Sequence, residues 1–444
     1  DLLFIFLILV AFTGFILAYR GAGRGALLFT YAALGLAVLA KDILGAVGPA
    51  LAIALFFLLT RERQVRAQWV PWAGLGLFLI IAVPWYLAVE FQNRGFLWYT
   101  VVDNHLLNFT RQRFFPDEDI PLTPQEFLGV TAIGFFPWSL MVPWAVARAL
   151  RRPWDTVEAR IWLLLGLWSV LVVGFFTLSP VKFPHYALPA FPALALLVAK
   201  LWEDVLDRAP GAPSARALLI LPMIVLAGLA AVGFVAWRGE VRLPSGTLSL
   251  VDVATRNLEA RGQSAPFPSY GQLQPLFGTL TLIFGAGALG LAVAVWRRLP
   301  RVGLGMLLAV MLAFLPVTVE GLALFSKSRS VKVMAEAVLA RAGATDVVVH
   351  EGPLENSGSL LLYLGRPVKV VDGIQSTLAF GATFPEAREV FWDREQLRER
   401  WGGRERLFLV SVVNPEKSVV RDLDRASVHL LLGNGGRWLY SNRP

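Results

Sequence analysis

Apolar runs long enough to cross a lipid bilayer follow one another along most of this chain, and they limit its fold more than any other feature does. A bilayer core of about 30 Å requires roughly 20 apolar residues per helix. About ten such runs occur, at positions 2–19, 26–40, 43–60, 69–89, 127–147, 161–178, 184–201, 217–237, 277–296 and 302–325. The sequence therefore predicts a mainly α-helical, polytopic membrane protein with about ten transmembrane helices.

Basic residues fall in every second connection between these runs and predict the orientation of the chain. They are Arg20 and Arg24; Arg61, Arg63 and Arg66; Arg148, Arg151, Arg152 and Arg160; Lys200, Arg208 and Arg216; and Arg297, Arg298 and Arg301. Cytoplasmic connections of membrane proteins carry an excess of Lys and Arg. We therefore expect these five connections inside, and the bends at Lys41 and Lys182, the segment 90–126 and everything after 326 outside.

The composition accounts for the basic character of the chain without nucleic acid. The five basic connections hold 15 Lys or Arg and six Asp or Glu, a net charge of +9 that equals that of the whole chain. No nucleic-acid partner is predicted. The absence of cysteine excludes disulfides, thiolate catalysis and cysteine-ligated metals. Because Asp1 leads directly into an apolar run, without an initiator methionine or a leader, we expect the N-terminal part of the natural protein to lie upstream.

The composition changes after Ser326 and predicts two domains. Residues 1–325 are expected to form the transmembrane domain, in which the aromatic and charged segment 90–126 lies at the outer interface. Residues 326–444 are expected to form a soluble α/β domain outside the membrane. Its predicted elements are a helix at Glu336–Arg341 and strands at Asp346–Glu351, Pro367–Asp372, Leu407–Ser411 and Val428–Leu432.

Lys41 lies between two long apolar runs, with Asp42 beside it. A lysine at the outer end of a helix can simply extend to the lipid headgroups. The position of Lys41 between two long apolar runs and the neighbouring acid favour a binding site or an ion pair as strongly as this simple role, so both interpretations stay open. Acids at the membrane edges, Asp1, Glu90 and Glu320, are costly in lipid and are functional candidates for that reason.

The bend from Ser179 to Pro189 concentrates functional side chains between two apolar runs. It contains Lys182, His185 and Tyr186. A cation and an imidazole at a membrane surface can bind a phosphate, because a lysine supplies a point charge with three donors. The alternative is an ordinary turn in which proline ends the helices and tyrosine anchors the interface. We predict a phosphate site here.

A third cluster lies in the outer segment, where Asp103 and His105 precede Arg111 at near-helical spacing. Side chains at this spacing can share one face and hold a phosphate or a metal. A single histidine in an interfacial helix is more often only hydrogen-bonded there. The sequence alone leaves the phosphate, the metal and the structural interpretations open.

Several stretches together resemble a known family. They are Asp1–Phe4, Gly35–Lys41, Pro84–Tyr86 followed by Asn104–Phe109, Phe135–Ser139, and Phe176–Leu188 followed by Phe191–Leu194. In this order and spacing, over roughly residues 1–200, they resemble the GT-C membrane glycosyltransferases that use polyprenyl-phosphate sugars. The similar branch contains bacterial aminoarabinose transferase and protein O-mannosyltransferase.

The resemblance implies an inverting transfer of one sugar from a polyprenyl-phosphate donor to a lipid, glycan or protein acceptor at the outer membrane face. Such transfers serve lipopolysaccharide modification and protein O-mannosylation. The resemblance places the main catalytic base upstream of Asp1 and makes Asp1 a supporting carboxylate. The candidate donor-phosphate ligands are Lys41, Lys182, His185, Tyr186 and Arg111. Some members bind a divalent metal near the donor phosphate, and His105 is the candidate ligand for it.

Two alternatives to the glycosyltransferase were weighed. A transporter or flippase of lipid-linked sugars would share the helices and the outer cations, but it should show internal repeats and interrupted helices at mid-membrane. A membrane-anchored assembly or sensor protein would leave the Lys41 and Lys182 bends without a role. We therefore expect an enzyme of the bacterial inner (plasma) membrane, in contact with membrane lipids. Its active site and C-terminal domain are expected on the periplasmic or extracellular side.

Overall fold

The computed structural model describes residues 1–61, 66–115, 120–151, 153–239, 252–260, 267–374 and 378–444. Within these ranges the chain divides into two compact units. The first comprises Asp1–Phe114, Pro121–Ala227 and Gly287–Leu308, and the second comprises Phe115–Ile120, Gly228–Ala286 and Ala309–Pro444.

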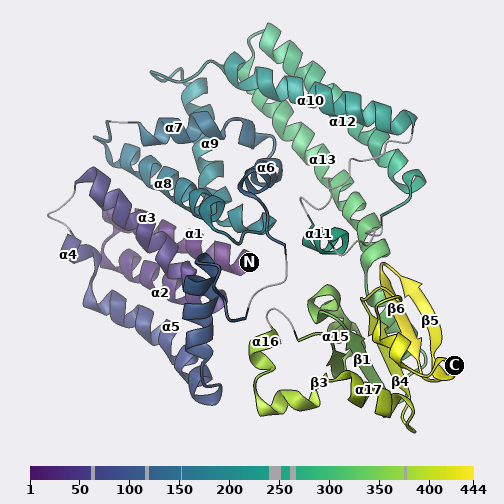
Figure 1. Cartoon of the computed structure of the whole chain (residues 1–444). Helices are drawn as coiled ribbons and strands as arrows, with labels where there is room; N and C mark the ends of the chain where they lie inside the picture. Colours follow the sequence, from purple (N-terminus) through teal and green to yellow (C-terminus); the bar gives the residue numbers. More distant parts are fainter. Residues whose placement is uncertain (62–65, 116–119, 152, 240–251, 261–266, 375–377) are drawn as a thin grey trace. The chain divides into compact units, whose positions relative to one another are not determined.

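Apolar helices form most of the chain before residue 330 (Figure 1). They are α1 (Leu2–Leu17) with its π-helical extension η1 (Ala18–Ala22), α2 (Arg24–Ala40), α3 (Leu44–Thr60), α4 (Arg66–Trp69), α5 (Trp72–Gln92), η3 (Trp98–Leu107), α6 (Pro124–Gly134), η4 (Trp138–Leu140), α7 (Val142–Leu150), α8 (Val157–Leu178), η5 (Pro184–Ala190), α9 (Phe191–Leu206), α10 (Ala215–Arg238), α11 (Val253–Ala260), α12 (Tyr270–Trp296) and α13 (Pro300–Arg329).

Nine of the predicted spans coincide with the helices α1, α2, α3, α5, α8, α9, α10, α12 and α13. Seven of these, counted over the described residues and with η1 and η5 included, are long and apolar enough to cross a membrane. The other two, α2 and α3, are apolar but have 17 residues each. The predicted fold class is confirmed, whereas the count of about ten spans is not.

The predicted span 127–147 is wrong as a continuous helix. The structure divides it into α6, the short 3₁₀ helix η4 and α7. Pro137 lacks the amide hydrogen that a continuing helix requires, and Pro143 occupies the first turn of α7, where that loss costs nothing. The start of α6 is defined by a capping box in which Thr123 and Glu126 bond each other's backbone amides.

Antiparallel packing of α1 and α2 places the start of α1 beside the end of α2. Ala11 of α1 and Ala33 of α2 belong to one buried cluster, and small residues at such positions let two helices approach closely. At the far end of α2, a Cβ on Gly45 would lie 2.8 Å from the backbone of Ala37. Glycine therefore permits the tight bend that carries Lys41 between α2 and α3.

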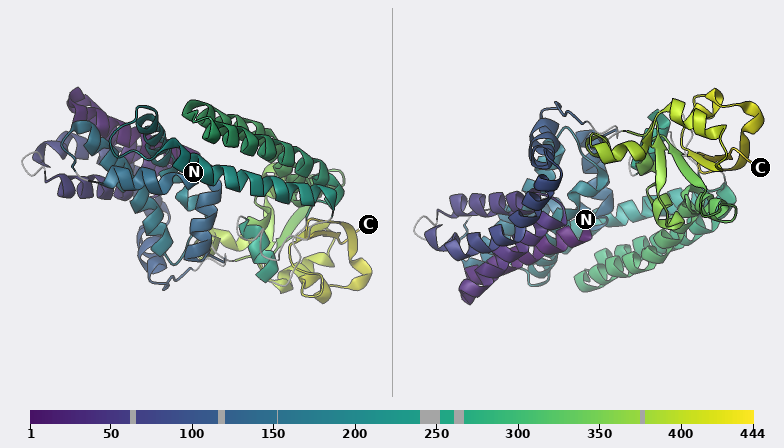
Figure 2. Two further views of the ribbon diagram at one scale, coloured as in Figure 1. Left: turned by 90° about the horizontal axis from the view of Figure 1, so that it is seen from above. Right: turned by 90° about the horizontal axis from the view of Figure 1, so that it is seen from below.

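Three long helices, α10, α12 and α13, contact one another along their lengths (Figures 1 and 2). A Cβ on Gly233 of α10 would lie 2.8 Å from the hydroxyl oxygen of Thr281 in α12, so these two helices are close. Leu276 of α12 and Val317 of α13 share a buried cluster. The apolar run that contains a GxGxxG pattern, residues 285–290, lies inside α12 and is helical throughout.

The C-terminal part of the chain is an α/β sheet, as predicted. Its strands are β1 (Val347–Glu351), β2 (Val368–Val371), β3 (Phe391–Trp392), β4 (Leu407–Ser411), β5 (His429–Asn434) and β6 (Arg437–Ser441), in the order β3-β2-β1-β4-β6-β5. The first four pair in parallel, and β6 pairs antiparallel with both β4 and β5. The accompanying helices are α14 (Lys332–Leu339), η6 (Leu354–Ser357), α15 (Ser359–Leu364), α16 (Leu378–Gly381), η7 (Pro385–Glu389), α17 (Arg394–Trp401), η8 (Val419–Asp422) and η9 (Arg425–Ser427).

Both faces of this sheet are covered by buried side chains. Phe408 and Val410 of β4 pack with α14 and α15, whereas Leu407 and Leu409 pack with α17 and η8. The alternation follows from the two-residue period of a strand. Four predicted strands correspond to β1, β2, β4 and β5, whereas β3 and β6 were not predicted.

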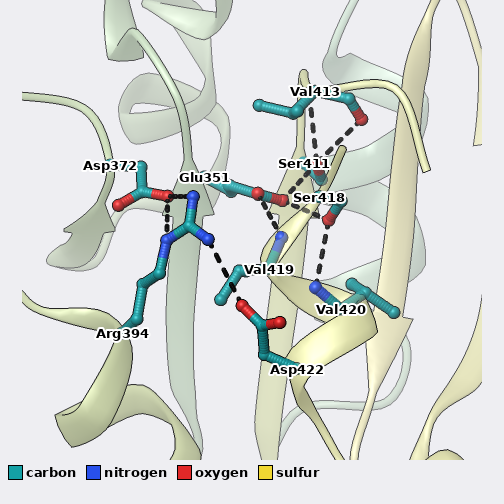
Figure 3. Close-up of polar contacts among 9 residues, drawn as sticks. All are labelled: Glu351, Asp372, Arg394, Ser411, Val413, Ser418, Val419, Val420 and Asp422. Atoms are coloured by element: carbon teal, nitrogen blue, oxygen red, sulfur yellow. Dashed lines mark hydrogen bonds and ion pairs between the residues drawn. The ribbon is translucent and has the colours of Figure 1, made fainter. Parts of the chain in front are cut away.

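The strand order reverses at β1. The strands β2 and β3 lie on one side of β1, and β4 lies on its other side. At this point the buried carboxylate of Glu351 accepts hydrogen bonds from Ser411, Ser418 and the amide of Val419 (Figure 3).

The domain boundary predicted at 325/326 lies inside α13, which continues to Arg329. That boundary stays a prediction.

Candidate functional site

Three of the predicted site residues lie close together in the first unit. Lys41 Nζ lies 2.6 Å from Asp1 Oδ1, and His185 Nε2 lies 3.5 Å from Asp1 Oδ2. Asp1 precedes α1, Lys41 follows α2 and His185 lies in η5. The cluster therefore joins three helix ends that are up to 184 positions apart in the sequence.

Aromatic rings surround the ammonium group of Lys41. It lies 5.5 Å from the ring centre of Phe4 and 5.6 Å from that of Tyr186, distances at which the ring faces attract a cation. Tyr186 also packs against Phe176 of α8, with ring centres 4.8 Å apart. Burial lowers the pKa of Lys41, an effect that the charge of Asp42 opposes. Lys41 is therefore an ion-paired residue rather than one that merely extends to the headgroups.

Lys182 differs from Lys41 because it lacks an acidic partner. Only 4% of its surface is exposed, and its ammonium group has no hydrogen bond or ion pair within the described part of the chain. Burial lowers its pKa, and the positive charge of Arg111 lowers it further. The backbone carbonyl of Lys182 accepts a hydrogen bond from the amide of Leu122, 3.0 Å away, which fixes the bend. Two neighbouring cations without an anion between them are suited to bind an anionic ligand.

His105, the predicted metal ligand, contacts a backbone carbonyl and a carboxylate. Its Nδ1 lies 2.7 Å from the carbonyl oxygen of Thr100, and its Nε2 lies 3.7 Å from Asp42 Oδ2. Asp42 raises the pKa of His105, an effect that burial opposes. The described residues contain no group of three or more His, Cys, Asp or Glu side chains that could hold a metal ion. The role of His105 as a metal ligand stays a prediction.

The candidate site thus contains two parts with different charge. In the first part, Asp1 neutralises Lys41 and approaches His185; in the second, Lys182 and Arg111 present uncompensated positive charge. A carboxylate can orient a hydroxyl nucleophile, and cations without an acidic partner can stabilise a phosphate that leaves with negative charge. The arrangement can therefore support displacement of a phosphate.

Two contributors to this site were not predicted as site residues. Phe4 contacts Lys41, and its position three residues after Asp1 on a helix could have indicated a shared face. Asp42 was noted only as a neighbour of Lys41. Its contact with His105 joins residues 63 positions apart, and a single sequence contains no signal for it.

A cavity of about 390 Å³ lies at the ends of α7, α8 and α9 that carry predicted cytoplasmic connections. Asp204 in its lining pairs with two cations: Arg148 Nε lies 2.5 Å from it and Lys200 Nζ lies 3.2 Å from it. The cavity contains none of the predicted site residues.

Sequence comparison relates the chain to curated bacterial transferases, while no family model matches it. It is 26% identical over 420 residues to the undecaprenyl phosphate-alpha-4-amino-4-deoxy-L-arabinose arabinosyl transferase of Pseudomonas paraeruginosa, covering 92% of this chain and 67% of the relative. It is 31% identical over 205 residues to transferase 1 of that name from Sodalis glossinidius, covering 44% of this chain and 35% of the relative. With the Erwinia tasmaniensis transferase the match is 28% identical and spans 37% of the relative. The chain thus covers little more than a third of two of these relatives.

Solved structures share the fold. The crystal structure of ArnT from Cupriavidus metallidurans bound to undecaprenyl phosphate superposes with a TM-score of 0.71, at 22% identity, over 98% of this chain and 74% of that one. Its apo form gives a TM-score of 0.72 at 20% identity, over 99% and 73%. The resemblance predicted from the sequence is confirmed: this chain is similar in sequence and in fold to the GT-C glycosyltransferases of the aminoarabinose transferase branch.

Proposed function

We propose that this protein transfers a sugar from a polyprenyl-phosphate donor to a lipid acceptor at the outer face of the bacterial inner membrane. The relatives of known name are arabinosyl transferases that use undecaprenyl phosphate-linked aminoarabinose, which favours transfer over transport. One solved neighbour contains undecaprenyl phosphate. The observation that carries the proposal is the Lys182 side chain, which is 4% exposed, has no acidic partner in the described part of the chain and feels the positive charge of Arg111.

The charges of the site support a division of roles. As the bond between the anomeric carbon and the donor phosphate breaks, negative charge develops on the leaving phosphate, and Lys182 and Arg111 are the cations free to stabilise it. Lys41 is held by Asp1 at 2.6 Å. We assign Lys41 and His185 to orienting the Asp1 carboxylate, and Tyr186 to enclosing Lys41.

The acceptor oxygen attacks the anomeric carbon and inverts it, and a carboxylate removes the acceptor's proton. Asp1 is a supporting carboxylate in this proposal. A lipid acceptor suits a site built from helix ends, because such ends lie at the membrane interface. Glycan and protein acceptors are the alternatives that the assay must distinguish.

The test is transfer of labelled aminoarabinose from undecaprenyl phosphate by the full-length protein in liposomes containing envelope lipids. Lys182→Ala is expected to slow transfer by roughly 30- to 1,000-fold, because loss of one charge-stabilising contact costs about 2–4 kcal/mol of transition-state stabilisation.

The matched control is Arg298→Ala, which removes a cation between α12 and α13. The rate of sugar transfer by this variant is expected to stay within about twofold of that of the unmodified protein, because substitution of a solvated surface residue has little effect on the folded protein. Equal rates for the two variants would remove Lys182 from the site. Absence of labelled lipid with the unmodified protein, under conditions in which a related transferase is active, would refute the proposed function.

A further inference from the structure

Asp103 is the most deeply buried acid in the described part of the first unit, with 0% of its surface exposed. It lies in η3, eight residues before Arg111, whose φ is positive. A buried carboxylate is retained at acceptable cost only where it is paired and hydrogen-bonded. None of the roles proposed above uses it, so its burial requires an explanation.

The partners of Asp103 lie ten and eleven positions later in the chain. Its Oδ1 accepts a hydrogen bond from the amide of Phe114 at 2.5 Å, and its Oδ2 lies 3.4 Å from Arg113 Nε. Another nitrogen of the Arg113 guanidinium donates to Asn104 Oδ1 at 2.5 Å. The side chain of Arg113 is itself only 7% exposed. The ion pair therefore fastens the segment after η3 back onto η3.

Arg111 lies within the loop that this ion pair closes. Its φ of 58° is in the left-handed region, which a residue with a side chain adopts only when its surroundings hold it there. The amide of Gln112 donates to the carbonyl of Leu107 at 2.8 Å, and the amide of Phe114 donates to Asp103. Both bonds follow Arg111 directly and fix the direction of the chain on leaving it.

The same loop is packed against the helix that leads to Lys182. The ring of Phe109 stacks on Phe175 of α8, with centres 6.2 Å apart. Phe175 lies four residues before Ser179, whose hydroxyl donates to the carbonyl of Val181 in the Lys182 bend. The loop that carries Arg111 therefore packs against α8, the helix that leads directly into the Lys182 bend.

We propose that Asp103 and Arg113 are positioning residues: their buried ion pair fixes the loop that carries Arg111 and so determines the affinity for the phosphate of the lipid-linked donor. This inference rests on the proposed function of Lys182 and Arg111. Neither Asp103 nor Arg113 contacts the donor in this scheme. Their effect reaches the phosphate only through the guanidinium of Arg111.

The experiment is a double-mutant cycle that measures binding of undecaprenyl phosphate to the full-length protein in detergent. Asp103→Asn and Arg111→Ala are each expected to weaken binding by about tenfold, since each removes one charge-assisted contact or its support. The double variant is expected to bind within about twofold of Arg111→Ala, because residues that act through one another are not additive. In transfer assays Asp103→Asn should raise the KM for the donor more than it lowers kcat.

The matched control is Asp204→Asn, which alters another largely buried Asp–Arg pair, Arg148–Asp204, with nitrogen and oxygen 2.5 Å apart. It should leave undecaprenyl phosphate affinity unchanged. If Asp103→Asn does not accumulate in folded form, Arg113→Lys replaces it in the cycle, because it retains the charge but loses the forked geometry. The Arg113→Lys variant should then lose less affinity for undecaprenyl phosphate than the Arg113→Gln variant.

Additive losses in the cycle, or unchanged binding in the Asp103 and Arg113 variants, would overturn the positioning role. If Arg111→Ala and Lys182→Ala also bind undecaprenyl phosphate normally, the proposed function of these cations fails instead. A loss of binding in Asp204→Asn equal to that in Asp103→Asn would show a general loss of folding and would likewise reject the specific role.

Discussion

His350 in β1 is a fully buried titratable residue outside the candidate site. Its Nδ1 lies 3.1 Å from the carbonyl oxygen of Gly352 and donates to it, so its Nε2 must be the unprotonated nitrogen in the neutral ring. That Nε2 is buried without a partner in the described part of the chain. Burial, aided by the charge of Arg437, lowers the pKa of His350 to about 4. The residue is therefore neutral in the folded domain at physiological pH.

This protonation state predicts that the sheet loses stability in acid. Below a pH of about 6.5 the unfolded chain takes up a proton on His350 that the folded chain does not, so stability falls until about pH 4. The full effect is about 3 kcal/mol. Hydrogen exchange of β1 and β4, corrected for its intrinsic pH dependence, measures it in the whole protein. His350→Gln should remove this part of the dependence; an unchanged profile in that variant would disprove the assignment.

At the scale of elements, Glu351 connects the end of β1 to the loop after β4. The hydroxyls of Ser411 and Ser418 each donate to its carboxylate at 2.6 Å, and the amide of Val419 donates at 2.7 Å (Figure 3). Beside it, Arg394 bridges Asp372 and Asp422, with nitrogen–oxygen distances of 2.6 and 3.2 Å. Burial raises the pKa of Glu351. The sheet therefore loses stability as the pH rises and Glu351 ionises, whereas His350 lowers stability as the pH falls.

We expect Glu351→Ala to destabilise the sheet by roughly 2–5 kcal/mol, because it leaves the Ser418 hydroxyl and the Val419 amide without an acceptor and Ser411 with only the carbonyl of Val413. Glu351→Gln keeps the volume and one acceptor oxygen, and should cost clearly less. Faster hydrogen exchange in β4 and η8 would report the difference, with the exposed Glu399→Ala as the control. Equal effects of the alanine and glutamine variants would show that the donors do not depend on this side chain.

At the scale of the whole molecule, the charge pattern predicts which residues face each side of the membrane. The chain contains no cysteine, so single introduced cysteines report their own position. In intact cells with a permeabilised outer membrane, Gln112→Cys and Lys417→Cys should react with an impermeant maleimide. Arg297→Cys should react only after the inner membrane is opened. Labelling of Arg297→Cys in intact cells, or protection of Gln112→Cys, would reverse the proposed orientation.

The sequence by itself determined the elements of this protein. Nine apolar runs became helices, four β-branched or apolar runs became strands, and the ordered motifs indicated the correct branch of transferases. Such features depend on residues close together in the chain, namely apolar length and two-residue alternation. The interrupted span at 127–147 and the strands β3 and β6 were missed, because proline placement and strand pairing override a short apolar pattern.

Tertiary structure alone decided how the charged residues are paired. Lys41 and Lys182 look alike in the sequence, yet the fold gives Lys41 the carboxylate of Asp1 and leaves Lys182 buried beside Arg111. Likewise, the fold brings His105 to Asp42, 63 positions earlier in the chain. These partners are joined by packing of helix ends that lie far apart in the chain, and in a low-dielectric environment the presence or absence of one partner determines what a charge can do.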